Sequence, residues 1–546
     1  MKAKSVDLSS PPDLTLSHGT GAVAKRKPIY QSLLPPCNAA CPAGENIQAW
    51  LSLAQQGDIQ QAWQVLMNDN PFPAIHGRVC YHPCEAACNR NEVDQAVSVH
   101  AIERYLGDVA LAEGWLPEYN ATPSGKKILI VGAGPSGLAA AYHLARLGHS
   151  VEIRDAGNSA GGMLRFGIPA YRLPRNILDG EIYRLLRMGV KITLNHRVDD
   201  LKQEREQGGF AAAFVAIGAH ISKKTEIPAQ EASKIIDAVS YLEAIEQGQK
   251  LNLGRRVAIY GGGNTAMDAA RSAKRLGAEP MIIYRRDMAN MPAHQFEAYE
   301  ALEEGVQINW LRTIKDFSEQ QLTVELMELD EQGYPQPTGK FETLAADSLI
   351  LALGQNVDTR LLSQFEQIRY HDGVVEVNQH MMTGAEGIFA GGDMVPSLRT
   401  VTIATGHGKK AAHCIDTWLQ QTQLTTPPKA KIATSEQLHL WYQTDAPVNP
   451  KNQLSPEQRV DDFSEVTQGL SAEQAQFEAQ RCYSCGNCFE CDSCYGACPQ
   501  QAISKQGEGQ GYAIDYQRCT GCQACVNQCP CGAMTMTMID TVEENQ

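Results

Sequence analysis

The pattern of hydrophobic and polar residues divides the chain into segments of different kinds. Residues 1–30 are rich in Ser, Pro and Lys and show no sustained period, which predicts a flexible arm. Over residues 46–67 apolar side chains recur at helical spacing and Gly57 interrupts them, so the pattern predicts two helices. Short β-rich runs then alternate with helical segments over residues 126–418, which is typical of a doubly wound α/β protein. The polar, proline-bearing stretch 420–474 predicts a linker along the surface, and a cysteine-dense segment follows it.

Composition and charge exclude several classes of function. The 546 residues include 47 Lys and Arg against 62 Asp and Glu, so the net charge is −15. Nucleic acids and anionic membranes bind clustered positive charge, and neither is therefore expected as a main partner. No run approaches the roughly 18 apolar residues of a membrane span, and residues 1–10 lack the apolar core of a secretory signal. The sequence thus predicts a multidomain cytoplasmic protein without a membrane span.

A first dinucleotide site is predicted where the apolar strand 126–131 runs directly into a glycine-rich turn that opens a helix. In such a turn the first glycine permits the tight bend, the second lets the backbone approach a pyrophosphate, and the third lets helix and strand pack closely. After the next strand an acid stands at the spacing that suits hydrogen bonds from ribose hydroxyls. The predicted residues of this Rossmann-type site are Gly132, Gly134, Pro135, Ser136, Gly137 and Asp155.

A second site of the same kind follows the strand 256–260. Its third small residue is an alanine, which still allows close packing. The next strand, 281–284, ends in two arginines where the 2′-phosphate of NADPH would lie, although two solvated arginines are the other interpretation. NADPH is therefore favoured over NADH. The predicted NAD(P) residues are Gly261, Gly263, Asn264, Thr265, Ala266, Arg285 and Arg286.

The 17 cysteines gather at the two ends of the chain, and an odd number in a large chain without an export signal favours metal ligation over disulfides. Near the C-terminus the spacing C-x2-C-x2-C-x3-C-P occurs twice, which is the pattern of bacterial ferredoxins with two [4Fe–4S] clusters. The fourth cysteine of each run ligates the other cluster. The predicted ligand sets are Cys488, Cys491, Cys494 and Cys529, and Cys519, Cys522, Cys525 and Cys498.

Besides the five cysteines near the N-terminus, four more lie outside those two sets. Cys482, Cys485 and Cys531 are either alternative ligands or buried thiols. Cys414 stands alone in the helical stretch 411–418 and is expected to be a core thiol.

Residues 387–393 and 402–408 resemble the second FAD segment of flavoprotein reductases of the glutathione-reductase type, in which an NAD(P) domain is inserted into an FAD domain. The resemblance implies that the first dinucleotide site binds FAD, that Asp393 holds the ribityl chain, and that the helix after residue 402 faces the flavin. His407 is expected to be structural and no catalytic residue is assigned, because hydride transfer needs alignment rather than an acid or base. The FAD residues implied here are Gly392, Asp393, Thr402 and Ile403.

Two cysteine motifs bracket the predicted pair of helices: Cys37-x3-Cys41-Pro and Cys80-x3-Cys84-x3-Cys88. With the motifs at 71–73, 77–80, 161–164, 166–169 and 291–293, they resemble the small subunit of NADPH-dependent glutamate synthase and the corresponding part of dihydropyrimidine dehydrogenase, over about residues 28–418. That family carries [4Fe–4S] clusters in this helical domain. The resemblance adds Gly162, Met163 and Leu164 to the expected FAD residues.

The chain departs from that family just upstream of Cys37, where residues 30–36 lack the two cysteines of a usual member. The family pairing implies one cluster on Cys41, Cys80, Cys84 and Glu103, which leaves Cys37 and Cys88 short of ligands. Alternatively, four of the five cysteines hold one cluster and Glu103 is an ordinary helix-surface acid. One or two N-terminal clusters are therefore expected.

The expected fold is α/β, with two Rossmann-type domains of the glutathione-reductase kind between a helical iron–sulfur domain and an α+β ferredoxin-like domain. The expected boundaries are a flexible arm (1–30), the helical [4Fe–4S] domain (31–120), the FAD domain (121–227 and 353–418), the NAD(P)H domain (228–352), a linker (419–475) and the ferredoxin-like domain (476–546).

The chemistry implied is electron transfer. NAD(P)H gives electrons in pairs and clusters take them singly, so a flavin must stand between them. The predicted function is an FAD-dependent oxidoreductase that passes electrons between NAD(P)H and [4Fe–4S] clusters, to or from ferredoxin or a partner redox enzyme, alone or in a hetero-oligomer. One alternative is the small subunit of NADPH-dependent glutamate synthase, which serves a large amidotransferase subunit. Another is a passive iron–sulfur carrier, against which the intact glycines of both sites argue.

Overall fold

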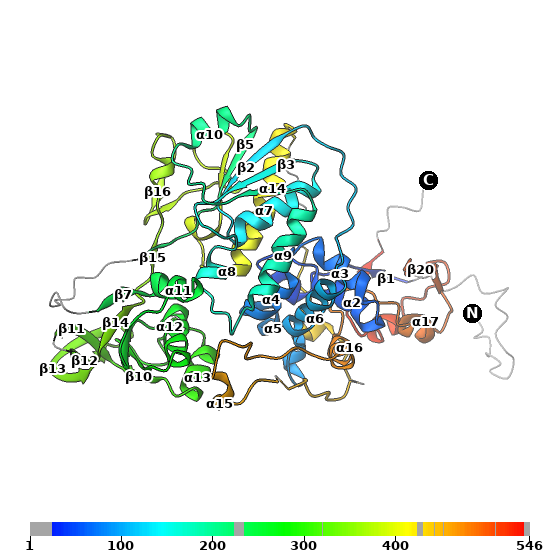
Figure 1. The fold of residues 1–546 in the computed structure, drawn as a ribbon. Helices are drawn as coiled ribbons and strands as arrows, with labels where there is room; N and C mark the ends of the chain where they lie inside the picture. Colours follow the sequence, from blue (N-terminus) through cyan, green and yellow to red (C-terminus); the bar gives the residue numbers. More distant parts are fainter. Residues whose placement is uncertain are drawn as a thin grey trace, which may run out of the picture.

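The computed structural model describes residues 24–222, 234–318, 320–422, 430–441, 443–450, 452–507 and 509–539. Figure 1 shows two sheet domains, a helical domain in blue beside them, and a C-terminal domain in orange and red beyond the helical domain. Among the described residues, no helix combines the length and apolar character that a membrane crossing requires.

The first sheet domain is built on a parallel five-stranded sheet with the order β18-β5-β2-β3-β4. Its central strands are buried apolar runs, as expected where helices cover both faces. The chain leaves this sheet after β5 and returns only in β18, so the second sheet domain is inserted between them. The elements are β2 (Lys127–Val131), α7 (Pro135–Arg146), β3 (Ser150–Arg154), α8 (Met163–Phe166), α9 (Arg175–Arg187), β4 (Lys191–Thr193), α10 (Leu201–Gln207), β5 (Ala212–Val215), η3 (Arg360–Leu362), β16 (Tyr370–His371), β17 (Val374–Val375), β18 (Ile388–Ala390), η4 (Gly392–Met394) and α14 (Val401–Leu419).

The inserted domain has its own parallel sheet, β10-β9-β8-β14-β7, and an antiparallel three-stranded sheet, β11-β12-β13. A short antiparallel pair, β6 and β15, lies where the chain passes between the two domains. The elements are β6 (Ile221–Ser222), β7 (Ile235–Asp237), α11 (Ala238–Glu246), β8 (Arg256–Tyr260), α12 (Asn264–Arg275), β9 (Glu279–Tyr284), α13 (Gln295–Glu303), β10 (Gln307–Trp310), β11 (Arg312–Ser318), β12 (Gln321–Leu329), β13 (Pro335–Ala345), β14 (Ser348–Leu351) and β15 (Gln355–Asn356).

The helical domain contains the predicted pair of helices, α2 and α3, and their prediction is confirmed. Gly57 ends α2 in the left-handed conformation, with φ of 83°, while Trp50 and Trp63 are fully buried. The elements are α1 (Pro36–Ala40), α2 (Ile47–Gln56), α3 (Ile59–Met67), α4 (Pro73–Val79), α5 (Pro83–Ala86), η2 (Asn89–Glu92) and α6 (Val99–Ala112).

The described part of the expected linker crosses the surface of the other domains through η5 (Ser435–Gln437) and α15 (Pro456–Arg459). The backbone N–H of Val466 donates to the carbonyl of Tyr171, and the side chain of Arg459 forms an ion pair with Glu303. The next helix, α16 (Ala472–Gln480), packs on α2 and α6. This last part of the sequence therefore belongs structurally to the helical domain.

The C-terminal domain is closed by a strand from the other end of the chain. Strand β1 (Arg26–Tyr30) pairs antiparallel with β21 (Met534–Met538), so the prediction of a flexible arm is wrong for residues 26–30. The apolar side chains of β1 were too few to reveal a partner 500 residues away. The rest of the predicted arm, up to residue 23, lies outside the described residues. The remaining elements are α17 (Ser493–Ala497), β19 (Ile503–Lys505), β20 (Tyr512–Ile514) and α18 (Ala524–Asn527).

Helices α4 and α6 cross with their backbones in direct contact, because each has a glycine at the crossing point. A Cβ on Gly107 would lie 2.3 Å from the backbone nitrogen of Ala74, and one on Gly77 would lie 2.4 Å from the Cβ of Arg104. This crossing fixes the position of Cys80, which follows α4, relative to Glu103 on α6.

We expect Gly107→Ala to destabilise the helical domain by about 1–3 kcal/mol, because the added methyl group has no space. Helix propensity alone would make alanine more stable than glycine by up to about 1 kcal/mol. A decrease in the free energy of unfolding would therefore show the packing effect. The measurement is the lowest-temperature calorimetric unfolding transition. Gly496→Ala is the matched control, since its methyl group would meet no atom within 4 Å. An equal or higher transition temperature for Gly107→Ala would contradict the prediction.

Candidate functional site

A cavity of about 680 Å³ lies at the carboxyl ends of the strands of the first sheet domain, where ligands bind in open α/β sheets. The turn after β2, the turn before α8 and the turn after β18 all open into it. The predicted residues that line it are Gly132, Gly134, Pro135, Ser136, Asp155, Gly162, Met163, Gly392 and Asp393.

The backbone around this cavity fits a dinucleotide. A Cβ on Gly134 would have no heavy atom closer than 4.0 Å, so this glycine leaves open space where a pyrophosphate can approach. Helix α7 begins at Pro135 and directs its N-terminal N–H groups there. Within the described residues the hydroxyl of Ser136 is buried and has no hydrogen-bond partner. The carboxylate of Asp155 accepts hydrogen bonds from the backbone N–H groups of Ala133 (2.6 Å) and Gly157 (2.7 Å), which hold it beside the turn.

The other predicted FAD residues lie behind the cavity rather than in its lining. A Cβ on Gly137 would lie 2.0 Å from the carbonyl oxygen of Gly132, so this glycine allows α7 to pack against β2. Leu164 is fully buried in the core. Thr402 and Ile403 stand in the first turn of α14, where the side chain of Thr400 accepts from the N–H of Ile403 (3.2 Å).

His407 and Asp393 lie at the turn that follows β18. The imidazole Nδ1 of His407 accepts a hydrogen bond from the backbone N–H of Gly392 (3.2 Å), which fits the structural role expected for it. Burial raises the pKa of the Asp393 carboxyl above its usual value.

The same cavity contains polar residues that the sequence did not indicate. Arg197 and Arg360 both pair with Asp358, at 3.1 Å and 2.6 Å. No fixed spacing marks these residues. Arg154 also lines the cavity. Its place at the end of β3, directly before Asp155, was the one feature of the sequence that could have predicted this.

The second dinucleotide site has the same local construction. Gly261 has φ of 148°, and a Cβ there would lie 2.3 Å from the carbonyl oxygen of Ala352, whereas a Cβ on Gly263 would meet no atom within 4 Å. Helix α12 begins at Asn264, whose side chain accepts from the N–H of His294 (3.0 Å) and donates to the hydroxyl of Tyr81 (2.5 Å). Tyr81 follows Cys80, so this site touches the helical iron–sulfur domain.

The remaining predicted NAD(P) residues surround that turn. Thr265 is partly exposed in the first turn of α12, and Ala266 is fully buried. Arg285 is exposed at the end of β9. The guanidinium of Arg286 lies over the ring of Tyr334, 5.6 Å from its centroid, and within the described part of the chain its Nε is buried without a hydrogen-bond partner.

In the helical domain, Cys41, Cys80 and Cys84 lie near the buried carboxyl groups of Glu45 and Glu103. Burial and the nearby carboxyl of Glu103 raise the pKa of the Cys80 thiol to about 12. Glu103 accepts a hydrogen bond from the side-chain amide of Asn70 (2.5 Å), and only 5% of its surface is exposed. The alternative that Glu103 is a helix-surface acid is therefore wrong, because α6 directs it into the core.

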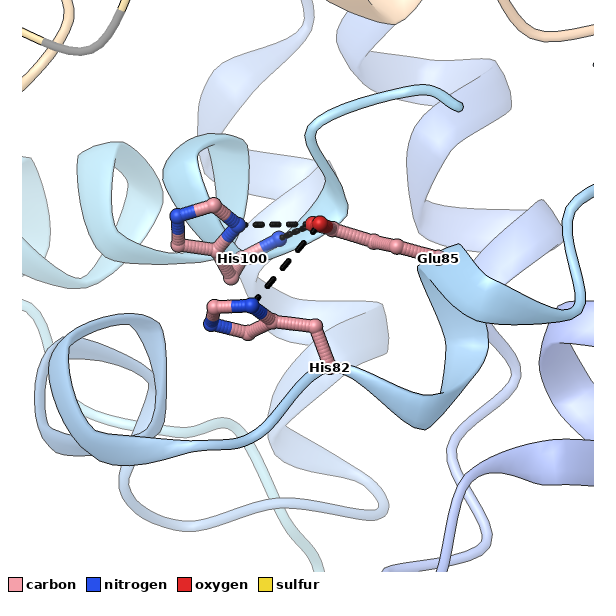
Figure 2. Close-up of side chains that lie close together, drawn as sticks. All are labelled: His82, Glu85 and His100. Atoms are coloured by element: carbon pink, nitrogen blue, oxygen red, sulfur yellow. Dashed lines mark hydrogen bonds and ion pairs between the residues drawn. The ribbon is translucent and has the colours of Figure 1, made fainter. Parts of the chain in front are cut away.

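A polar group beside Cys84 fixes the short helix α5 (Figure 2). The carboxylate of Glu85 accepts hydrogen bonds from Nδ1 of His100 (2.7 Å) and from its backbone N–H (3.0 Å), while the rings of His82 and His100 stack with centroids 3.7 Å apart. Burial opposes ionisation of Glu85, but the two histidines outweigh it, and the pKa of this carboxyl is lowered to about 2. These contacts hold α5, and with it Cys84, in place.

The C-terminal domain brings its cysteines into two groups. Burial and the sulfurs of Cys529 and Cys488 raise the pKa of the Cys494 thiol, so these three lie together. Burial and the sulfurs of Cys519 and Cys498 raise the pKa of the Cys525 thiol to about 12. The fourth cysteine of each run thus lies beside the first three of the other run.

Comparison with known proteins places these sites in a family. Residues 126–408 match the family described as pyridine nucleotide-disulphide oxidoreductase. The chain belongs to this family. Residues 21–115 match the dihydropyrimidine dehydrogenase domain II with its 4Fe-4S cluster, and residues 487–533 match the 4Fe-4S dicluster domain.

The oxidoreductase is similar to three curated proteins. It is 34% identical to the beta subunit of the NADP(+)-dependent formate dehydrogenase of Moorella thermoacetica, over 82% of this chain and 70% of that protein. It is 31% identical to the beta subunit of the NADPH-Fe(3+) oxidoreductase of Geobacter sulfurreducens, over 82% and 75%. It is 31% identical to the glutamate synthase [NADPH] small chain of Escherichia coli, over 71% and 89%. The expected resemblance, fold class and function are thereby confirmed.

The oxidoreductase uses FAD, NAD(P)H and [4Fe–4S] clusters in its N-terminal and C-terminal domains. When bound, the flavin exchanges electron pairs with nicotinamide and single electrons with clusters. Helix α14 contacts both the cavity of the first sheet domain and the helical domain. Ala404 lines the cavity, and the hydroxyl of Thr402, half a turn away, donates a hydrogen bond to the sulfur of Cys80 (3.1 Å).

The two glycines of the first turn are expected to fail in different ways. Gly134→Ala should fold with an unchanged melting temperature but lose bound FAD, because its methyl group enters the open space of the cavity. Gly137→Ala should lower the melting temperature, because its methyl group collides with the carbonyl of Gly132. The measurements are flavin absorbance per chain and thermal unfolding of the apoprotein. Full flavin content in Gly134→Ala would exclude this turn as the pyrophosphate site.

Proposed function

We propose that this oxidoreductase takes electrons from NADPH and delivers them to a partner redox enzyme subunit that docks on its C-terminal ferredoxin-like domain. Ferredoxin is the alternative acceptor. We infer that it works in the cytoplasm, a reducing compartment in which thiols persist as ligands. The observation that carries the proposal is the hydrogen bond from Thr402 to Cys80, which connects the wall of the flavin cavity to an expected cluster ligand.

The assignment of roles to residues is part of the proposal. The FAD site would be the cavity of the first sheet domain, the NADPH site would be the turn before α12, and the ferredoxin-like cysteines would ligate two clusters in the predicted sets. The Cys41, Cys80 and Cys84 group with Glu103 would hold a further cluster. Burial and the carboxyl of Glu45 raise the pKa of the Glu103 carboxyl well above its usual value.

Exposure of the C-terminal domain supports docking there. Cys488, Cys491 and Cys522 are exposed, unlike the other ferredoxin-type cysteines. Large apolar side chains are exposed beside them: Phe489 at 40% and Tyr495 at 47%. Exposed aromatic residues around a redox centre are typical of a protein interface. The names of two relatives support the same inference. One is named as the beta subunit of an NADP(+)-dependent formate dehydrogenase, and the other as the beta subunit of an NADPH-Fe(3+) oxidoreductase.

A second candidate is the small subunit of a glutamate synthase. The observation in its favour is that the chain covers 89% of the small chain of Escherichia coli. The two candidates differ in the partner. A large subunit with glutamine amidotransfer activity would support the second, and a different redox enzyme would support the first.

We expect NADPH, added anaerobically to the reconstituted protein, to bleach the flavin and then reduce the clusters. Arg285→Ala should raise the NADPH concentration needed by roughly 10- to 100-fold, because a charged hydrogen bond to the 2′-phosphate is lost, and should leave the NADH titration unchanged. Flavin absorbance and the EPR signal of reduced clusters are followed together. If dithionite reduces the flavin and neither nucleotide does, the proposed flow from NADPH is wrong, and the chain is either a ferredoxin-driven NAD(P)+ reductase or a passive carrier.

We expect Phe489→Glu to abolish co-purification of the partner subunit with a tagged chain from the native cells, because a charge replaces an apolar contact at the interface. Tyr183→Glu is the matched control, since Tyr183 is 57% exposed on α9 of the first sheet domain. Both variants should keep NADPH-driven flavin bleaching. A partner that binds Phe489→Glu as well as the wild type would exclude this face as the docking surface.

A further inference from the structure

Two cysteines of the C-terminal segment lie in the helical domain. Cys482 follows α16, and its backbone carbonyl accepts a hydrogen bond from the side-chain amide of Gln55 on α2 (3.3 Å). The same amide donates to the carbonyl of Ala479 (2.9 Å), and the buried guanidinium of Arg90 donates to the carbonyl of Arg481 (2.7 Å). The peptide that carries Cys482 is therefore fixed to the helical domain from two sides.

The loop that carries Cys485 is fixed to the segment just before Cys37. The N–H of Leu33 donates to the carbonyl of Gly486 (3.0 Å), and the side-chain amide of Asn487 donates to the carbonyl of Leu33 (3.3 Å). Gly486 has no side chain because a Cβ there would lie 2.5 Å from the Cβ of Leu33. Cys485 thus lies next to the segment that precedes Cys37.

The thiols of Cys37 and Cys88 meet those of Cys482 and Cys485 at this contact. The sulfur of Cys37 lies close enough to the sulfurs of Cys482, Cys88 and Cys485 to interact with each of them electrostatically. The sulfur of Cys482 likewise lies close to those of Cys485 and Cys88, and Arg90, two residues after Cys88, donates to the carbonyl next to Cys482. Each of these thiols is half-buried among the others. Four thiols gathered in one protein contact form a complete donor set for a metal centre.

We propose that Cys37, Cys88, Cys482 and Cys485 hold a [4Fe–4S] cluster of their own. Cys482 and Cys485 have the x2 spacing by which two thiolates wrap one cubane. Cys37 and Cys88 also fall within the segment that matches a 4Fe-4S domain.

This cluster joins the two iron–sulfur domains. On one side Cys37 and Cys88 belong to the domain of Cys41 and Cys84. On the other side the N–H of Gly486 donates to the carbonyl of Cys531 (2.6 Å), two residues beyond Cys529, a predicted ligand of the ferredoxin-like domain. If the proposed function holds, this site relays electrons between them, one at a time. The existence of the cluster does not depend on that function.

The test is metal analysis of three variants of the full chain, reconstituted anaerobically. The double variants Cys482→Ser/Cys485→Ser and Cys37→Ser/Cys88→Ser should each lose four iron and four sulfide atoms per chain. The quadruple variant should lose no more than either. EPR of the dithionite-reduced protein should show one spin fewer in each. Cys414→Ser, which removes a buried thiol on α14, is the control and should lose nothing.

Three results would overturn the proposal: unchanged iron in the double variants, loss of zinc instead of iron, or loss of eight iron atoms in the quadruple variant. If a double variant does not fold, the single variant Cys485→Ser replaces it. It should change the EPR signal of one cluster while flavin content stays the same, and an unchanged EPR spectrum would exclude Cys485 as a ligand. These measurements need no NADPH, so failure of the proposed function would not mimic them.

Discussion

Helix α14 can lie against both the flavin domain and the helical domain only because two of its residues have no side chain. A Cβ on Gly406 would lie 2.1 Å from the carbonyl oxygen of Pro42, and one on Gly408 would lie 2.3 Å from the carbonyl oxygen of Ser136. These backbone contacts bring the first turn of α14 to Cys80. Larger residues would force the helical domain away from the cavity of the first sheet domain, and the proposed electron path depends on that short separation.

Buried polar groups beside the same contact have a second role. His76 is fully buried and hydrogen-bonds Thr405 on α14 (3.0 Å) and Asn70 (3.0 Å), while Asn70 also donates to Glu45 and Glu103. Burial lowers the pKa of His76 to about 3 and raises that of Glu45 to about 7. Hydrogen bonds among these groups reduce the cost of burying them, and the network fixes side chains beside expected cluster ligands.

Sequence alone could predict the features that depend on local spacing. The glycines of the two dinucleotide turns and the repeated C-x2-C runs are set by neighbours a few residues away, and fold class followed from them. The features that depend on distant partners could not be predicted. Strand β1 looks like part of a polar tail until β21 is placed beside it, and Glu103 looks exposed until α4 crosses α6. From the sequence, Cys482 and Cys485 are either alternative ligands or buried thiols, and only the packing of α16 shows that they lie at the helical domain.

The pairing of β1 with β21 has a consequence for how the chain matures on the ribosome. Residue 26 can pair with residue 538 only after the roughly 500 residues between them have been made, which takes on the order of a minute. Until then β1 has an unpaired edge that other chains can bind. Strand β1 emerges first, yet its edge is covered only when β21 has been made. Protection of that edge therefore depends on the slow closure of a long loop, which competes with aggregation.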